Sequence, residues 1–136
     1  MPTFNYEDLM KSESLITPSA IRQASGSERK RVIIDTDIEC EMDDQHAVAY
    51  TLFNSHVFEV EGVTVTGEHR WQAETYTNEA KRVVHLCASK APIYTGAFTT
   101  YDKIKKNIHK SKYEGHEAVD FIIERAHAKI VPVLNM

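Results

Sequence analysis

Acidic side chains gather directly after a short apolar run in the first third of the chain. Val32 to Ile34 is apolar without interruption, and carboxylates fill most of the ten residues that follow. These carboxylates belong to Asp35, Asp37, Glu39, Glu41, Asp43 and Asp44. Like charges crowded this closely raise one another's pKa values, so the cluster is costly without a cation. Many oxygen ligands in a short segment suit a hard divalent metal ion.

Three other interpretations compete with a metal site. An EF-hand loop also spaces its ligands at alternate positions, but it requires Gly where Cys40 stands and Glu where His46 stands. A magnesium-dependent phosphohydrolase of the haloacid-dehalogenase type would use Asp35 as its nucleophile, yet Glu39 would repel the phosphate. A solvated acidic turn is the simplest alternative, because carboxylates in the first turn of a helix complement the helix dipole.

Strand and helix patterns alternate around this acidic segment. The chain is expected to form strands at 32–34, 58–66, 91–94 and 130–134, and helices from Asp43 and at 71–89 and 117–128. Trp71 and Tyr76 are expected on the buried face of the second helix, and a platform on which a base stacks is the alternative for them. The lysines from Lys103 to Lys112 are expected on a solvated segment. This order predicts an α/β fold with an open, mostly parallel sheet and helices on both faces.

The carboxyl ends of such strands lie at one edge, where open α/β sheets bind ligands. The acidic segment and the loop Gly67–Arg70 are therefore expected at that edge.

Length, net charge and cysteine content limit the number of domains and the kinds of partner that this chain is expected to have. The 136 residues suit one domain, here taken as 31–136 after a polar arm at 1–30 that contains a possible short helix near Pro18. The net charge of −4 gives no indication of nucleic-acid or anionic-membrane binding, and no apolar stretch is long enough to span a membrane. Two separated cysteines, Cys40 and Cys87, favour a reducing compartment, so we expect a cytoplasmic location.

Three ordered motifs resemble the inosine-uridine-preferring nucleoside hydrolases, and in particular a divergent nucleoside-hydrolase-like branch. Asp35-Thr36-Asp37 followed by Asp43-Asp44 is similar to the family's amino-terminal Asp-Thr-Asp-Pro-Gly-x-Asp-Asp. The segment 61–67, Glu-Gly-Val-Thr-Val-Thr-Gly, resembles its second strand and Thr/Gly loop, and 92–97 resembles its Pro-Val-Tyr-x-Gly-Ala. The likeness covers the chain from about Arg31 onward.

The resemblance implies a Rossmann-like hydrolase that releases free base from ribonucleosides in purine and pyrimidine salvage. It implies a Ca²⁺ ion, with Mg²⁺ as the alternative, held by Asp37 and Asp44, and Asp37 as the general base toward water. Asp43 and Glu68 would contact the nucleoside, Glu68 standing where better-known members have Asn. Asp35 would support the turn behind the ligands.

The chain also departs from the family pattern. The insert Ile38–Met42 is two residues longer than Pro-Gly-x, and the family's later Asp and His would lie beyond Met136, so the resemblance implies an amino-terminal half. A truncated or degenerate member that binds a metal ion or a partner without turnover is therefore a second hypothesis. An exposed final strand would favour a homo-oligomer.

Overall fold

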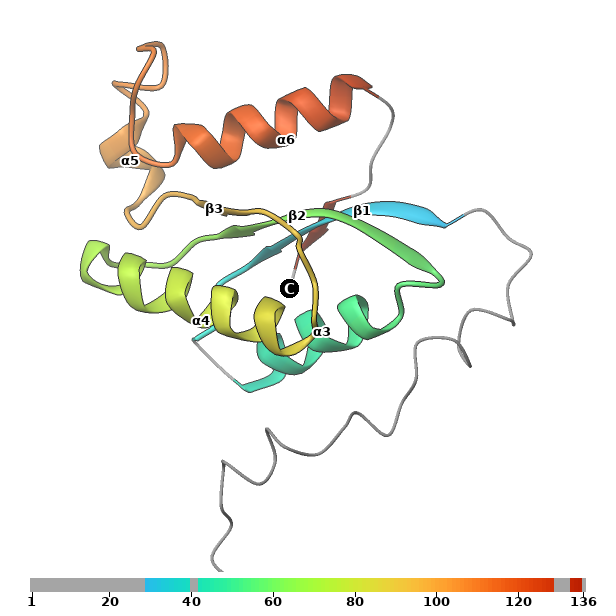
Figure 1. Cartoon of the computed structure of the whole chain (residues 1–136). Helices are drawn as coiled ribbons and strands as arrows, with labels where there is room; N and C mark the ends of the chain where they lie inside the picture. The colour runs from blue at the N-terminus through green and yellow to red at the C-terminus, as the bar shows by residue number, and fades with distance from the viewer. Residues whose placement is uncertain (1–28, 40–41, 129–132, 136) are drawn as a thin grey trace, which may run out of the picture.

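The computed structural model describes residues 29–39, 42–128 and 133–135, so nearly all of the expected arm, including the short helix near Pro18, lies outside the described residues. Strands alternate with helices along the described chain (Figure 1). The strands are β1 (Lys30–Thr36), β2 (Phe58–Val65), β3 (Ile93–Thr95) and β4 (Val133–Asn135). The helical elements are α3 (Met42–Phe53), the 3₁₀ turn η2 (Arg70–Gln72), α4 (Ala73–Leu86), α5 (Tyr101–Ile104) and α6 (His116–Ala128).

The strands form one open sheet in the order β3-β2-β1-β4, and each neighbouring pair is parallel. The first three strands are added in one direction, and the chain then crosses back to place β4 on the other side of β1. Because such crossovers are right-handed, reversing their direction moves the connecting helix to the opposite face. Helices α3 and α4 lie on one face and α6 on the other, as Figure 1 shows. The predicted α/β fold with a parallel sheet is confirmed.

The larger core lies between the sheet and the helices α3 and α4. Alternate residues of the strands face it, among them Ile34 and Val65, because successive strand side chains point to opposite faces. Its buried members are Ile34, Ile38, Val48, Leu52, Val63, Val65, Tyr76, Ala80, Val83, Val84 and Phe98. The helical spacing of the α3 and α4 members confirms the apolar stripes expected from the sequence.

A smaller core holds α6 against the other face. Phe121 packs on Ile33, and its ring stacks on Tyr94 with centroids 4.3 Å apart and planes 19° apart. Gly62 of β2 makes room for it, since a Cβ there would come within 2.6 Å of Phe121 Cζ. The packing of α6 on the sheet therefore requires glycine at this position of β2.

A bulge in β2 sets which residues reach α6. Val32 pairs with Val60 and Ile33 with Gly62, so Glu61 is the extra residue. Its side chain accepts a short hydrogen bond from Arg31 and pairs with Arg125 of α6 at 3.6 Å. Glu61 and Gly62 thus both contact α6, although successive residues of a regular strand point to opposite faces of the sheet.

The segment expected as one helix at 71–89 is divided in the structure. The 3₁₀ turn η2 precedes α4, which ends at Leu86, where Ala88 adopts a left-handed conformation with φ of 51°. In this ending the Ser89 N–H donates to the Val84 carbonyl at 3.0 Å, which satisfies a carbonyl of the last turn. None of the helices in the described ranges is both long and apolar enough to cross a membrane.

Candidate functional site at the carboxyl edge of the sheet

The carboxyl end of β1 carries the first predicted site residues. Asp35 is half-buried and accepts a hydrogen bond of 2.6 Å from the Thr64 hydroxyl on the adjacent strand. Asp37 follows the strand and is also half-buried. Thr36 between them is 1 % exposed, and its hydroxyl has no hydrogen-bond partner within the described residues. This hydrogen bond joins the end of β1 to β2.

The second acidic pair lies in the first turn of α3, where its carboxylates complement the helix dipole. Asp44 is 8 % exposed, whereas Asp43 is exposed to solvent. Burial of a carboxylate is costly unless it has an ion-pair or hydrogen-bond partner, so the position of Asp44 is unusual for an aspartate. Helix α3 packs on the same face of the sheet as Ile34 and Ile38, which brings its first turn to the side of β1 that Thr36 also faces.

The residues at this edge offer the oxygen atoms that a hard cation binds, but only a few of them. Asp37 and Asp44 offer oxygen donors, and the buried Thr36 hydroxyl next to Asp37 is an unsatisfied oxygen. However, no three or more His, Cys, Asp or Glu side chains among the described residues form a group able to hold a metal ion. Cys40 and Glu41, inside the acidic segment, lie outside the described residues. The described residues therefore form no complete group of ligands for a metal ion.

The loop after β2 carries the remaining predicted residue, Glu68. It is exposed and borders a cavity of about 570 Å³ together with His69, Trp71, Phe98 and Lys103. The His69 and Trp71 rings are nearly parallel, with centroids 6.1 Å apart and planes 17° apart. Among the three cavities described here, none is lined by Asp35, Asp37, Asp43 or Asp44. The structure therefore places Glu68 in a cavity that it does not share with the aspartates.

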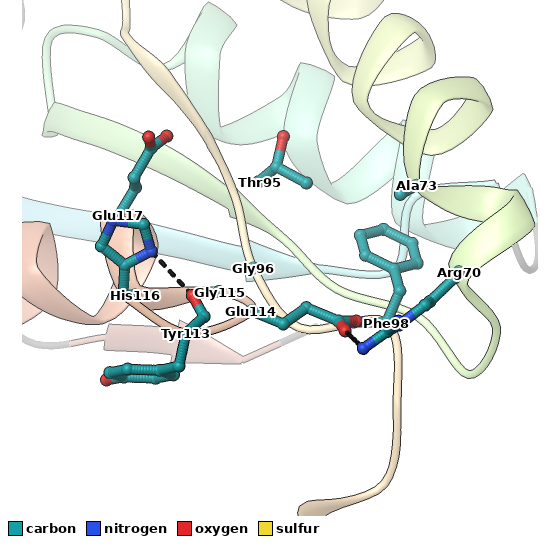
Figure 2. A pocket seen from close by; sticks show the side chains of 10 residues that line it. All are labelled: Arg70, Ala73, Thr95, Gly96, Phe98, Tyr113, Glu114, Gly115, His116 and Glu117. Carbon is teal, nitrogen blue, oxygen red and sulfur yellow. Dashed lines mark hydrogen bonds and ion pairs between the residues drawn. The ribbon is translucent and has the colours of Figure 1, made fainter. Parts of the chain in front are cut away.

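A second cavity, of about 310 Å³, lies where β3 ends and α6 begins (Figure 2). Its wall is an ion pair of 2.5 Å between Arg70 and Glu114, and Glu114 also accepts a hydrogen bond of 3.0 Å from the Phe98 N–H. Figure 2 shows these three residues side by side. Glu114 thus ties together the chain segments that follow β2 and β3 and precede α6. Arg70 and Phe98 border this cavity and the previous one.

The approach of the α6 loop to β3 is close because Gly115 allows it. Gly115 has φ of +84°, which favours glycine, and a Cβ there would lie 2.6 Å from the Ala97 nitrogen. The His116 Nδ1 lies 2.7 Å from the Tyr113 carbonyl oxygen, so the ring is oriented by its own loop. This loop forms one rim of the 310 Å³ cavity.

A third cavity, of about 370 Å³, lies between Glu39 and the first half of α4. Glu79 in its wall accepts hydrogen bonds from Arg82, at 2.6 and 2.7 Å, and from Gln45 of α3 at 2.8 Å. The negative charge of Glu79 is therefore already compensated. Glu39 and Glu74 remain as the other acidic side chains of this wall.

Sequence reasoning misplaced one residue of this edge and missed another. Trp71 was expected in the core with Tyr76, but it is 76 % exposed while Tyr76 is buried, so the expectation for Trp71 was wrong. The reason is that Trp71 belongs to η2 and not to α4, so it leaves the helical stripe. Glu114 had no signal in the sequence, because its partners are distant along the chain.

Comparison of the chain with protein-family models, with curated proteins and with solved structures finds no match.

Proposed function

We propose that the chain is a nucleoside-hydrolase-like, Rossmann-like domain that hydrolyses the N-glycosidic bond of ribonucleosides with the help of calcium. The observation that carries the proposal is the position of the acidic segment. It follows β1, which lies between β2 and β4, where the direction of strand addition reverses. Open α/β sheets bind their ligands outside the carboxyl ends of the strands at such a reversal.

The proposal assigns a separate task to each aspartate. Asp37 and Asp44 would hold the cation, which when bound supplies a fixed positive charge that orients sugar hydroxyls and acidifies a water molecule. Asp37 would accept the proton of the attacking water, and the exposed Asp43 would accept a hydrogen bond from a ribose hydroxyl. Nearby carboxylates would stabilise the positive charge that develops on the sugar as the base leaves.

The hydrogen bond of Asp35 distinguishes between a glycosidase and a phosphohydrolase. As the nucleophile of such an enzyme, its carboxylate would attack phosphorus, whereas here it accepts a hydrogen bond of 2.6 Å from the Thr64 hydroxyl. A carboxylate held by a buried neighbour is suited to supporting the turn that carries Asp37. This contact favours the glycosidase over the phosphohydrolase.

The test is release of free base from inosine, uridine or a nitrophenyl riboside by the full chain, with calcium and with a chelator. We expect calcium-dependent release, and we expect Asp37→Asn to lower it by at least about a hundredfold, the scale of a general base. Asp120→Asn, an equal loss of charge at an exposed position of α6, is the control.

Two outcomes would contradict the proposal. Magnesium-dependent phosphate release that Asp35→Asn abolishes would identify a phosphohydrolase. Calcium binding that Asp37→Asn abolishes, without any base release, would identify the non-catalytic metal-binding member.

A further inference from the structure

We propose that the 570 Å³ cavity beside Trp71 receives the planar base of a nucleoside, which stacks on the exposed indole. The identity of the ligand rests on the proposed function, whereas the stacking surface rests on the contacts described below. The volume lies in the range of cavities that bind small molecules. The cavity lies beside the segments that follow β2 and β3, at the ligand-binding edge of the sheet.

The exposure of Trp71 is the first observation. A tryptophan that is 76 % exposed gives up most of the stabilisation that burial of its large apolar surface would provide. The His69 ring lies nearly parallel to it at 6.1 Å between centroids and leaves most of the indole open to solvent. Aromatic side chains presented in this way stack the bases of nucleic-acid ligands, because every base has a π face.

The turn that carries the indole is fixed to the core. The His69 N–H donates to Gln72 Oε1 at 2.8 Å, and Gln72 Nε2 donates to the Tyr76 hydroxyl, also at 2.8 Å. Tyr76 is itself buried in the larger core. A binding surface held by such contacts loses little freedom when a ligand arrives, which favours affinity. Trp71 is therefore presented by a rigid backbone.

The inner wall of the cavity is equally well defined. Phe98 is 1 % exposed and meets Tyr76 edge to face, with centroids 5.8 Å apart and planes 75° apart. Gly67 allows this position, because a Cβ there would come within 2.6 Å of Phe98 Cε1. An apolar wall and an exposed indole in the same cavity suit a flat heterocycle.

The rim of the cavity carries charged groups of both signs. Arg70 is already paired with Glu114 at 2.5 Å, so the Glu68 carboxylate and the Lys103 ammonium remain as charged groups of the rim. A carboxylate acceptor and an ammonium donor can bond the edge of a base, which carries both donors and acceptors. A phosphate or carboxylate ligand would be attracted by Lys103 but repelled by Glu68.

The chain contains one tryptophan, so its fluorescence reports on Trp71 alone. The full chain is titrated with hypoxanthine, uracil and ribose in the presence of a chelator, so that neither calcium nor turnover is needed. We expect saturable loss of Trp71 emission with a free base and none with ribose. Absence of saturable quenching by both bases would overturn the proposal.

Variants separate stacking from other effects. In calorimetric titrations Trp71→Ala should weaken base binding about 5- to 150-fold, the range for a lost base stack, and Trp71→Phe should recover most of it. Tyr50→Ala, which removes an equally exposed aromatic ring from α3, should leave the affinity unchanged. Circular dichroism should give the same melting temperature for Trp71→Ala and the wild type, because the indole is exposed.

The failure of this inference differs from failure of the proposed function. Base binding through Trp71 without hydrolysis of any nucleoside would support the stacking site and contradict the proposed enzyme activity. Hydrolysis with equal base affinity in Trp71→Ala and wild type would support the enzyme activity and contradict the stacking site.

Discussion

Glu61 holds two arginines because of its place in the bulge of β2. The hydrogen bond from Arg31 is the main cause that holds the pKa of the Glu61 carboxyl below its ordinary value, and the charges of Arg31 and Arg125 act in the same direction, against the effect of burial. The same hydrogen bond raises the pKa of the Arg31 guanidinium. Arg125 also lies over the Phe121 ring, 5.7 Å from its centroid. One carboxylate thus connects β1, β2 and α6.

The stability conferred by Glu61 should depend on pH. Because its folded pKa is lower than its unfolded pKa, its contribution is complete above the ordinary value of 4.5 and is lost as the pH falls through the folded value. We expect Glu61→Gln to lower the free energy of unfolding at pH 7, and the difference from wild type to shrink as the solution is acidified below 4.5. Urea unfolding at a series of pH values measures this.

Glu124→Gln is the control for this experiment. Glu124 meets Arg125 at 3.7 Å, but its side chain is 71 % exposed, so its removal should have little effect at any pH. A cost of Glu61→Gln that stayed constant in acid would contradict the assignment.

Thr36 offers a second test at the residue scale. Its buried hydroxyl has no partner within the described residues, so Thr36→Val should raise the free energy of unfolding by about 1 kcal/mol. Thr64→Val is the matched change on the next strand, and it should lower stability by roughly the same amount because Thr64 donates to Asp35. Denaturant unfolding measures both. A loss of stability in Thr36→Val would mean that a water molecule or an ion occupies the hydroxyl in solution.

Helix α6 depends on a few contacts with the sheet. Ala118 and Phe121 are its buried residues, whereas Val119 and Ile123 on the same helix are 39 % and 49 % exposed. The position of Phe121 requires the missing side chain of Gly62 on β2. The loop before α6 is in turn held by Glu114 and Gly115 at the candidate site. The packing of one ring therefore helps to set the cavity at the end of β3.

Gly62→Ala tests this dependence. The added Cβ would approach Phe121 Cζ to 2.6 Å, so the free energy of unfolding should fall by about 1–3 kcal/mol, the usual cost of overpacking. Phe121→Leu in the same chain should remove part of that penalty, because the two groups no longer collide. A double-mutant cycle from denaturant melts measures the coupling, and strictly additive effects would contradict the contact.

The molecule as a whole presents the carboxyl ends of its parallel strands at one edge, with α3 and α4 on one face and α6 on the other (Figure 1). Strand β1 is paired on both sides, so the segment that follows it lies well inside this edge. Asp37 and the cavities bordered by Glu68 and Glu114 belong to loops at the carboxyl ends of different strands. A ligand that contacts several of them would couple elements that are far apart in the sequence.

Calcium should therefore stabilise the whole domain. If Asp37 and Asp44 bind the ion only when folded, calcium at a hundred times its dissociation constant should raise the free energy of unfolding by about 2.7 kcal/mol. Thermal melts with calcium and with a chelator measure the shift, which Asp37→Asn should abolish and Asp120→Asn should retain. An equal shift in both variants would show that the effect does not come from the acidic segment.

Much of the fold could be predicted from the sequence alone, because its signals are local. The apolar run before Asp35, the helical stripes that include Val48 and Val83, and the order of strands and helices predicted a parallel α/β sheet. Only the tertiary structure decided which side chains meet across that sheet. Glu61 reaches Arg125 through a bulge, and Trp71 is exposed because it lies in the 3₁₀ turn that precedes α4. Such contacts depend on register and on the packing of distant segments, which local periodicity does not encode.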